Sequence, residues 1–315
     1  MKPLAMMLLL LAAAAVHGNR STFPTDSRII HDACFSKHGQ VLFVADNTSI
    51  KAFSFNSRAL IREFAGAHQS PVMALSVAAD SSMLVSADRQ GMLVVHCMES
   101  GNVLHRFAKQ VEIILSTGIS PDGRYLAAGG TGQLLRLYDL SEMKAVDQFR
   151  VHTDDVTGVK FSLDGRWLVS VGADGKTTII DMEHKKLLRE TEAHDFFVRG
   201  LDFAPDGQYF ITVGDDGRYY TWNITQQGNV RMIRSGRVAR QWITSISHAS
   251  HSRAFAFATV RGRIRLIMPF GSLSANVRVP VNKVLLRPRA DERVEIIAAT
   301  RGKGIVFIDG KDMKP

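Results

Sequence analysis

The 315-residue sequence has few cysteines, no long hydrophobic run beyond Gly18, and no helical periodicity after that point. Its two cysteines, Cys34 and Cys97, are too few for a disulfide scaffold or a zinc site, both of which need more ligands at closer spacing. No later stretch approaches the roughly 20 apolar residues that span a bilayer. Blocks of lysine and arginine are also missing, which makes nucleic acid a poor candidate for a partner.

The chain begins with the pattern of a secretory signal peptide. Lys2 is followed by an apolar run, LAMMLLLLAAAAV, and then by the small-residue sequence VHG. The apolar run is shorter than a membrane-spanning helix, so an uncleaved anchor is the weaker alternative. We therefore expect residues 1–18 to be removed and residues 19–315 to form a single exported domain, either periplasmic or extracellular.

The charge of the chain is strongly positive. The whole sequence carries a formal net charge of +9, and the signal peptide removes one positive charge, Lys2, so the mature charge is 9 − 1 = +8. A soluble basic protein attracts acidic partners over long range, such as an anionic envelope surface, an acidic polymer or an acidic protein. This balance constrains the partner and not the fold.

A repeat of constant length organises the chain. The segments ISPDGRYLAAGG, FSLDGRWLVSVG and FAPDGQYFITVG begin at Ile119, Phe161 and Phe203, and the two steps are equal, 161 − 119 = 42 and 203 − 161 = 42. Each unit contains four short runs rich in Val, Ile, Thr and aromatic residues, separated by Asp-Gly and similar corners, which predicts antiparallel strands joined by hairpins. Four strands in about 42 residues is the spacing of one propeller blade. Seven units begin near Ile30, Val72, Ile114, Val156, Val198, Ile243 and Lys283.

The two ends of the chain are predicted to meet in one blade. The last unit stops at IVFID, residues 305–309, which leaves six residues, too few for a fourth strand. An unpaired blade edge would expose backbone ladder groups. We therefore predict that residues 19–27 supply the missing outer strand. Cys34 and Cys97 fall on different strands of different units, so isolated thiols are expected, with a disulfide as the alternative.

The fourth and fifth units share a set of polar side chains. The fifth has a histidine before its first strand, a threonine in its second, an aspartate in the next corner and a tryptophan in its third: His194, Thr212, Asp216 and Trp222. The fourth unit has His152, Ser170 and Asp174 one repeat earlier, with Ile180 in place of the tryptophan. This pattern resembles the WD repeats. The resemblance implies a seven-bladed all-β propeller in which these positions form a structural hydrogen-bonded network.

A histidine, a serine and an aspartate are also the ingredients of a hydrolase triad. An active site needs one constellation in one pocket, whereas a scaffold repeats its buried polar links from blade to blade. We therefore interpret these residues as structural and expect no catalytic residue, metal or cofactor. The pattern is degraded elsewhere: the second unit has His68, Ser86, Gln90 and His96, and the third has Gln110, Ala128, Gly132 and Tyr138.

The resemblance to WD-repeat propellers implies a rigid platform that holds partners on its wide faces. Binding residues are therefore expected on the loops before the first strands. Aromatic and arginine side chains dominate binding hot spots. The fifth and sixth units supply such side chains, and the matching place in the fourth adds one negative charge: Phe196, Phe197, Arg199, Arg237, Arg240, Trp242 and Asp155. The leading hypothesis is a non-enzymatic scaffold that binds a protein or an acidic surface polymer. The alternative is an enzyme or small-ligand binder that uses the central channel.

Overall fold

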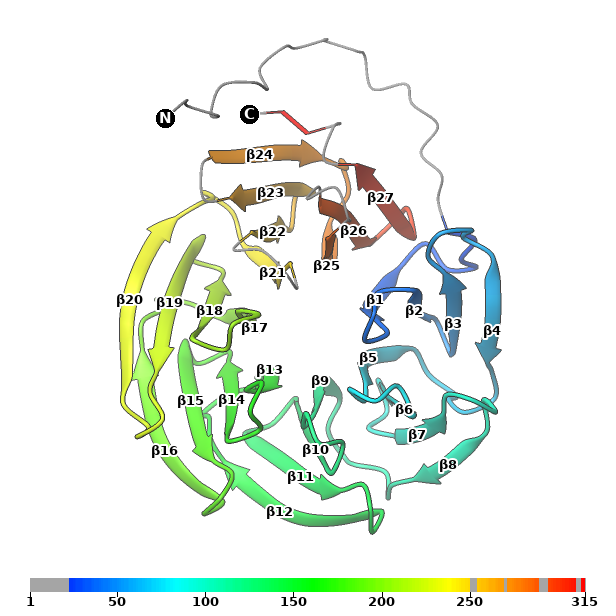
Figure 1. Cartoon of the computed structure of the whole chain (residues 1–315), viewed down its shortest axis with the longest axis horizontal. Coiled ribbons are helices and arrows are strands. Elements are labelled where there is room, and N and C mark those ends of the chain that lie inside the picture. The colour runs from blue at the N-terminus through cyan, green and yellow to red at the C-terminus, as the bar shows by residue number, and fades with distance from the viewer. Residues whose placement is uncertain (1–22, 250–253, 269–270, 289–293, 310–312, 315) are drawn as a thin grey trace, which may run out of the picture.

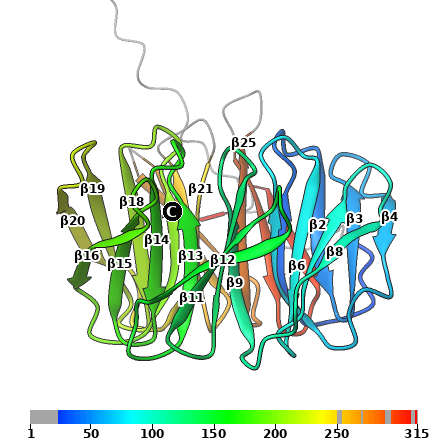
Figure 2. The same ribbon diagram turned by 90° about the horizontal axis from the view of Figure 1, so that it is seen from below.

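The computed structural model is a ring of seven antiparallel β-sheets around a central axis, and it describes residues 23–249, 254–268, 271–288, 294–309 and 313–314 (Figure 1). Viewed from the side, the sheets stand next to one another and form a thick disc (Figure 2). Six sheets have four strands in sequential order, and the seventh has three within the described residues. The predicted all-β, seven-bladed propeller is confirmed.

The first four blades run from the N-terminal end. Blade 1 contains β1 (Ile30–Phe35), β2 (Val41–Asp46), β3 (Ser49–Ser54) and β4 (Leu60–Phe64). Blade 2 contains β5 (Val72–Val77), β6 (Met83–Asp88), β7 (Leu93–Cys97) and β8 (Val103–Arg106). Blade 3 contains β9 (Ile114–Ile119), β10 (Tyr125–Gly130), β11 (Leu134–Asp139) and β12 (Lys144–Arg150). Blade 4 contains β13 (Val156–Phe161), β14 (Trp167–Gly172), β15 (Lys176–Asp181) and β16 (Lys186–Glu192).

The remaining three blades complete the ring. Blade 5 contains β17 (Val198–Phe203), β18 (Tyr209–Gly214), β19 (Arg218–Ile224) and β20 (Val230–Arg237). Blade 6 contains β21 (Ile243–His248), β22 (Phe255–Thr259), β23 (Arg263–Met268) and β24 (Gly271–Asn276). Blade 7 contains β25 (Val281–Pro288), β26 (Val294–Thr300) and β27 (Ile305–Asp309). Six blades begin at the predicted residue, and the seventh begins at Val281, two residues before the predicted Lys283.

The hydrophobic core lies between neighbouring blades. Every residue of β14, Trp167–Gly172, is buried, because a second strand is covered by the sheets on both sides. The outer strand of the same blade, Lys186–Glu192, is largely exposed. One apolar cluster joins Val169 and Val171 of blade 4 to Val198 and Phe210 of blade 5. This packing gives each blade a fixed angle to the next.

Tight hairpins bring the loops of one face together. Gly217 has φ of +70° in the corner between β18 and β19, and an added Cβ would lie 2.2 Å from the carbonyl oxygen of Ala239. Glycine is therefore required there both by backbone conformation and by space. The corner in turn holds the loop before blade 6, because the N–H of Val238 donates to the carbonyl of Gly217 at 3.0 Å.

Blades 1 and 7 close the ring by packing and by polar contacts between their inner strands. Asn282 Nδ2 donates to the carbonyl of Ile30 at 2.7 Å, and Lys283 Nζ lies 3.2 Å from Asp32 Oδ1. A shared apolar cluster includes Ile30 and Ala299. The first and last blades therefore meet without a strand exchanged between them in the described residues.

The predicted outer strand over residues 19–27 is not formed by residues 23–27, which are in no strand. Residues 19–22 lie outside the described residues, as does the expected signal peptide, residues 1–18. Phe23 instead packs its ring against Phe53, with centroids 5.4 Å apart, and is 2% exposed. The backbone N–H groups of Asp26 and Ser27 both donate to the Asp46 carboxylate at 2.7 Å. These contacts tie the segment to blade 1, and the next residue, Arg28, accepts the N–H groups of Gly302 and Gly304 in the β26–β27 turn of blade 7 at 2.6 and 3.1 Å.

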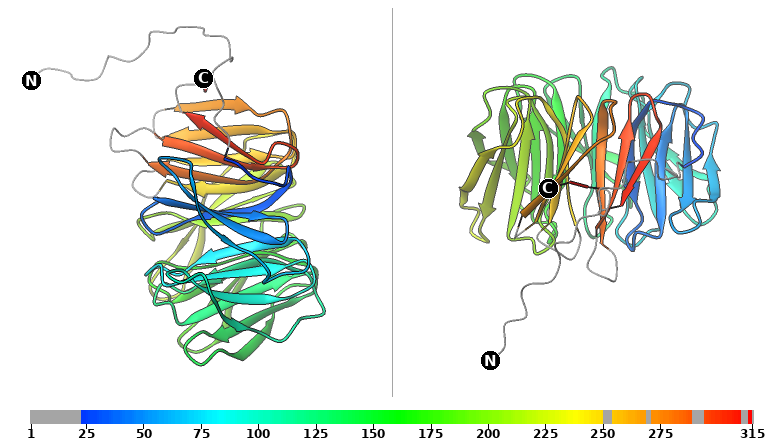
Figure 3. Two further views of the ribbon diagram at one scale, coloured as in Figure 1. Left: turned by 90° about the vertical axis from the view of Figure 1, so that its right-hand side faces the viewer. Right: turned by 90° about the horizontal axis from the view of Figure 1, so that it is seen from above.

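The C-terminal end contacts blade 6. Lys314 and Ser274 exchange two backbone hydrogen bonds, with N to O distances of 2.6 and 2.9 Å, and Met313 is buried in the core beside β24. Figure 3 shows the C-terminus next to this blade. The outer strand of blade 6 thus forms one isolated β-bridge with the C-terminal end.

The two cysteines were predicted to be isolated thiols, and the structure agrees. Cys34 on β1 and Cys97 on β7 are both free and partly buried, and burial raises the pKa of the Cys34 thiol. No helix among the described residues is long and apolar enough to cross a membrane.

Candidate functional site

The polar set of blade 5 forms one continuous hydrogen-bonded chain. His194 Nδ1 lies 3.0 Å from Asp216 Oδ2, and His194 Nε2 lies 3.0 Å from Thr212 Oγ1. Trp222 Nε1 donates to the same hydroxyl oxygen at 3.0 Å. Since Thr212 accepts from the indole, its own O–H donates to Nε2, which leaves Nδ1–H to donate to the carboxylate. All four side chains are buried, so the chain satisfies groups that water cannot reach.

The same chain recurs in blade 4 with a serine in it. His152 Nδ1 lies 3.0 Å from Asp174 Oδ1, and His152 Nε2 lies 3.0 Å from Ser170 Oγ. These distances match those of a catalytic triad, but the Ser170 side chain is 0% exposed and no substrate can reach its oxygen. Ile180, fully buried, stands where blade 5 has its tryptophan.

Blade 2 contains a version of the network that the sequence comparison missed. His68 Nδ1 lies 2.9 Å from Asp88 Oδ2, His68 Nε2 lies 2.7 Å from Ser86 Oγ, and His96 Nε2 lies 2.8 Å from the same oxygen. The carboxylate comes from Asp88 and not from Gln90, the residue at the aligned position. Asp88 also accepts the backbone N–H of Gln90 at 2.8 Å, so it closes the turn as well. Asp46 holds the equivalent position in blade 1, and the spacing 88 − 46 = 42, equal to the repeat, could have revealed Asp88.

Blade 3 replaces the network by aromatic packing. The residues of blade 3 at the network positions are Gln110, Ala128 and Gly132, and they cannot form the hydrogen-bonded chain of blade 5. Tyr138, at the tryptophan position, is 1% exposed and packs on the Phe107 ring with centroids 4.5 Å apart. The network is therefore a variable stabilising element of single blades, which favours the structural interpretation over the catalytic one.

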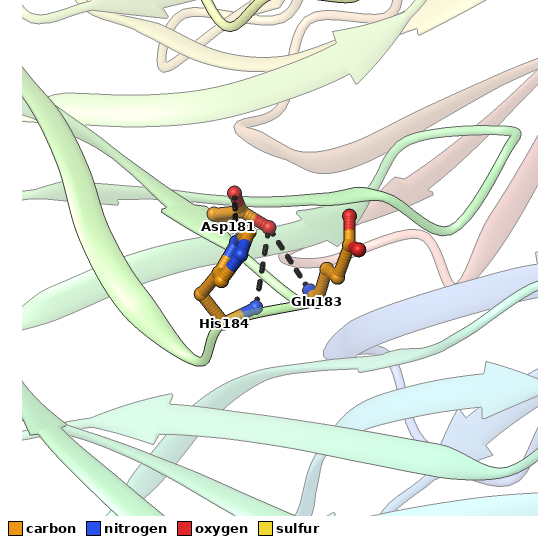
Figure 4. Close-up of side chains that lie close together, drawn as sticks. All are labelled: Asp181, Glu183 and His184. Carbon is orange, nitrogen blue, oxygen red and sulfur yellow. Dashed lines mark hydrogen bonds and ion pairs between the residues drawn. The ribbon is translucent and has the colours of Figure 1, made fainter.

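One exposed group of possible metal ligands has a structural role. Asp181, Glu183 and His184 lie close together in the turn between β15 and β16 (Figure 4). Asp181 accepts the N–H of Glu183 at 2.9 Å and lies 3.0 Å from His184 Nδ1. Asp139, one repeat earlier, accepts the N–H of Ser141 at 2.9 Å in the same turn of blade 3. An aspartate that closes the same turn in two blades serves the turn, and it does not indicate a cation.

The central channel carries charged side chains that pair with each other across blades. Lys160 of blade 4 forms an ion pair with Asp202 of blade 5, and the N–H of His248 donates to Asp202 Oδ2 at 2.8 Å. Burial opposes ionisation of Asp202, but Lys160 and His248 outweigh it and hold the pKa of that carboxyl well below its usual range. With the Lys283–Asp32 pair of blades 7 and 1, these carboxylates are engaged by neighbouring blades. These pairs link neighbouring blades of the ring, which favours a structural role for the carboxylates over a catalytic role in the channel.

Three aromatic side chains project from one wide face at blades 5 and 6. Phe196 is 63% exposed, Phe197 41% and Trp242 53%. Phe197 and Trp242 each directly precede an inner strand of adjacent blades, so their loops open on the same face. At this exposure Trp242 is not packed between blades.

The backbone holds these loops in place. The N–H of Asp215 donates to the carbonyl of Phe197 at 2.9 Å, and the N–H of Val260 donates to that of Trp242 at 3.1 Å. Arg199 stacks over the Phe197 ring with its guanidinium carbon 5.0 Å from the centroid. Arg199 also forms an ion pair with Asp215 through bonds of 3.0 and 2.8 Å. The aromatic side chains are thus exposed on a rigid support.

The other predicted binding residues differ in exposure and in whether a hydrogen bond to another blade already engages them. Arg237 and Arg240 are exposed at the end of β20 and in the loop that follows it. Asp155 is half-buried, and its carboxylate accepts the N–H of Gly132 in blade 3 at 3.1 Å. Asp155 thus links two blades. The face patch is therefore defined here by Phe196, Phe197, Arg240 and Trp242, with Arg199 and Arg237 beside it.

Comparison with known proteins agrees with this geometry. The family model described as "WD domain, G-beta repeat" matches residues 143–181 and 185–223, the two segments that contain the His152 and His194 networks. A mouse protein named "U3 small nucleolar RNA-associated protein 4 homolog" is 43% identical over 70 residues, which is 21% of this chain and 10% of that protein. The match thus spans about a tenth of that relative's length.

Solved structures match over nearly the whole chain. The structure titled "Crystal structure of RRP9 WD40 repeats" has a TM-score of 0.77 at 14% identity, covering 91% of this chain and 96% of that one. A chain of the "Crystal Structure of Mitotic Checkpoint Complex" has a TM-score of 0.77 at 18% identity, covering 98% of each. At this identity the likeness shows the fold alone. Together with the matched repeats and the seven blades, it leads to one conclusion: residues 143–181 and 185–223 match WD repeats, and the chain has the seven-bladed β-propeller fold of the WD-repeat structures that it resembles.

Proposed function

We propose that this protein is a non-enzymatic, exported interaction scaffold that binds a protein partner through the face patch. The observation that carries the proposal is the exposure of three aromatic side chains on backbone-fixed loops of adjacent blades. Phe196, Phe197 and Trp242 are each more than 40% exposed. Large aromatic residues with neighbouring arginines, held on a rigid support, bind with little loss of conformational entropy.

The partner class follows from charge. Arg237 and Arg240 are exposed next to the aromatic side chains, and the mature chain carries a net charge of +8, obtained as 9 − 1 for Lys2. This favours an acidic surface on the partner protein, which speeds encounter at low salt. The same charge favours an acidic surface polymer as the second candidate. A polymer held by charge alone would be released as salt rises, whereas aromatic anchors would keep a protein bound.

Loss of the face patch is expected to remove the partner. In the variant Phe197→Ala, Arg240→Ala, Trp242→Ala, affinity for the captured partner should fall roughly a hundredfold, because each hot-spot side chain contributes about 1 kcal/mol or more. The measurement is capture of partners by the immobilised protein, followed by titration of the captured species.

A matched control changes two apolar side chains and one arginine that are exposed on the outer strands of blades 1 and 2. The variant Leu60→Ala, Leu104→Ala, Arg106→Ala should retain the partner with affinity within about twofold of the unmodified chain. Identical partner sets for the face variant and the unmodified chain would remove the face patch from consideration.

Export is supported by the N-terminal sequence alone. The apolar run after Lys2 and the small-residue sequence VHG favour cleavage after Gly18. Sequencing the N-terminus of protein recovered from the native host should therefore find Asn19 first, in material outside the cytoplasm. Recovery of a chain that begins at Met1 inside the cell would contradict export.

A further inference from the structure

The outer strand of blade 5 differs from those of the other blades in charge and in length. β20, Val230–Arg237, has eight residues and the sequence VRMIRSGR, with three arginines and no acidic residue. The outer strands β12 and β16 contain acidic residues, among them Asp147 in β12 and Glu190 in β16. β20 is the outer strand of blade 5 (Figure 1), and it therefore presents a long edge of a single charge sign.

The outward edge of β20 has no partner strand in the described part of the chain. Its sheet runs in the order β17-β18-β19-β20, so β20 pairs only with β19, in a register from Arg218↔Arg237 to Ile224↔Val230. The N–H and C=O groups that face outward are then free to pair with another strand. On β24 of the next blade, one residue of the corresponding edge is engaged, because Ser274 exchanges two backbone hydrogen bonds with Lys314 in an isolated bridge.

The side chains of β20 favour one kind of added strand. Met232 is 47% exposed and Ile233 54%, so an added strand would cover apolar surface as well as backbone groups. The three guanidinium groups, of Arg231, Arg234 and Arg237, form no ion pair with any carboxylate in the described residues. A second copy of β20 would be repelled by like charge, whereas an extended acidic segment would be attracted.

We propose that the free edge of β20 binds an extended acidic segment of a partner protein by strand addition. Backbone hydrogen bonds along the edge provide affinity, and carboxylates of the segment pair with Arg231 and Arg234. The register Asn223↔Arg231, Trp222↔Met232 and Thr221↔Arg234 places both arginines on one face of the sheet and Met232 on the other, with Ile233 in the bulge between Met232 and Arg234. Apolar residues that alternate with the carboxylates of the segment therefore pack beside Met232. This surface goes beyond the face patch, and none of these four residues belongs to it. A protein with both surfaces holds a folded partner on its face and an extended one on its rim.

The probe is an eight-residue peptide of glutamate alternating with valine or isoleucine, blocked at both ends and labelled with fluorescein. Binding is followed by fluorescence anisotropy at low salt with the purified protein. The variant Arg231→Glu, Arg234→Glu should bind the peptide roughly tenfold or more weakly. The control Lys186→Glu, Arg189→Glu reverses two exposed charges on β16 and leaves the same net charge, and it should bind within about twofold of the unmodified chain.

Two more arms separate strand addition from other modes of attachment. A peptide of equal charge, with prolines in place of two central apolar residues, cannot complete the backbone ladder and should bind roughly tenfold or more weakly. Equal binding of the proline peptide would overturn strand addition, and equal binding by the Arg231→Glu, Arg234→Glu variant would overturn the site. Binding to vesicles of anionic phospholipid that depends on Arg231 and Arg234, without peptide binding, would assign the edge to a membrane surface instead.

Discussion

Replacing His152 by alanine is expected to lower the free energy of unfolding by about 3 kcal/mol without affecting any activity. The imidazole links Asp174 and Ser170 through bonds of 3.0 Å in a fully enclosed position. Its removal leaves a buried carboxylate and a buried hydroxyl short of partners and opens a cavity, and each of these costs about 1 kcal/mol or more. Equilibrium unfolding in urea provides the measurement.

The same blade offers a matched control. His184 also lies 3.0 Å from an aspartate, Asp181, but its side chain is 63% exposed. Water can replace an exposed bond, so His184→Ala should change the free energy of unfolding by less than about 0.5 kcal/mol. Equal effects of the two substitutions would show that burial does not determine the strength of the network.

Acidification from about pH 6.5 to about pH 4 is expected to destabilise the fold by about 3 kcal/mol through His96 alone. Burial, together with the nearby His68 and Arg106, lowers the pKa of His96 to about 4, compared with 6.5 for a free histidine. Between these two pH values the unfolded chain binds a proton at this residue that the folded chain does not bind. The free energy of unfolding is therefore unaffected by this group above pH 6.5 and falls as pH drops towards 4.

Burial also lowers the pKa of His68 and His152, which adds to the loss with the same sign. In the variant His96→Phe, the slope of unfolding free energy against pH should decrease by about 1.4 kcal/mol per pH unit between pH 4 and 6.5, the contribution of one proton. Urea unfolding at a series of pH values measures this slope. An unchanged slope in the variant would contradict the assignment to His96.

The repeat made most of the fold predictable from the sequence. Its constant step of 42 residues placed the first strands of blades 1 to 5 at the observed residues, and the run of β-type residues placed that of blade 6, which begins 243 − 198 = 45 residues after blade 5. The seventh was displaced by two residues, since the loops of blades 6 and 7 depart from the common length. Closure could not be read from the pattern, because it depends on contacts between opposite ends of the chain: Asn282 donates to the carbonyl of Ile30, and Lys283 pairs with Asp32.

The exposed aromatic residues of the candidate site could be predicted from the sequence, whereas the partners of individual polar side chains could not. The exposed positions of Phe196, Phe197 and Trp242 follow from their place directly before inner strands. Asp155 holds the aligned place in blade 4, yet it is engaged by the N–H of Gly132 in the neighbouring blade. Similarly, Asp88 and not Gln90 completes the network of blade 2, because a side chain two residues away reaches the same histidine. Alignment fixes where a backbone lies, but not which side chain fills a shared space.

The most direct test of the account compares partner capture by two variants at a temperature where both remain folded. His152→Ala should retain the partner with unchanged affinity despite its lower stability. The variant Phe197→Ala, Arg240→Ala, Trp242→Ala should lose the partner despite unchanged stability, because its side chains are exposed or lie on the face. The opposite result would contradict both roles: His152→Ala loses the partner or an enzymatic turnover, while the face variant retains the partner fully.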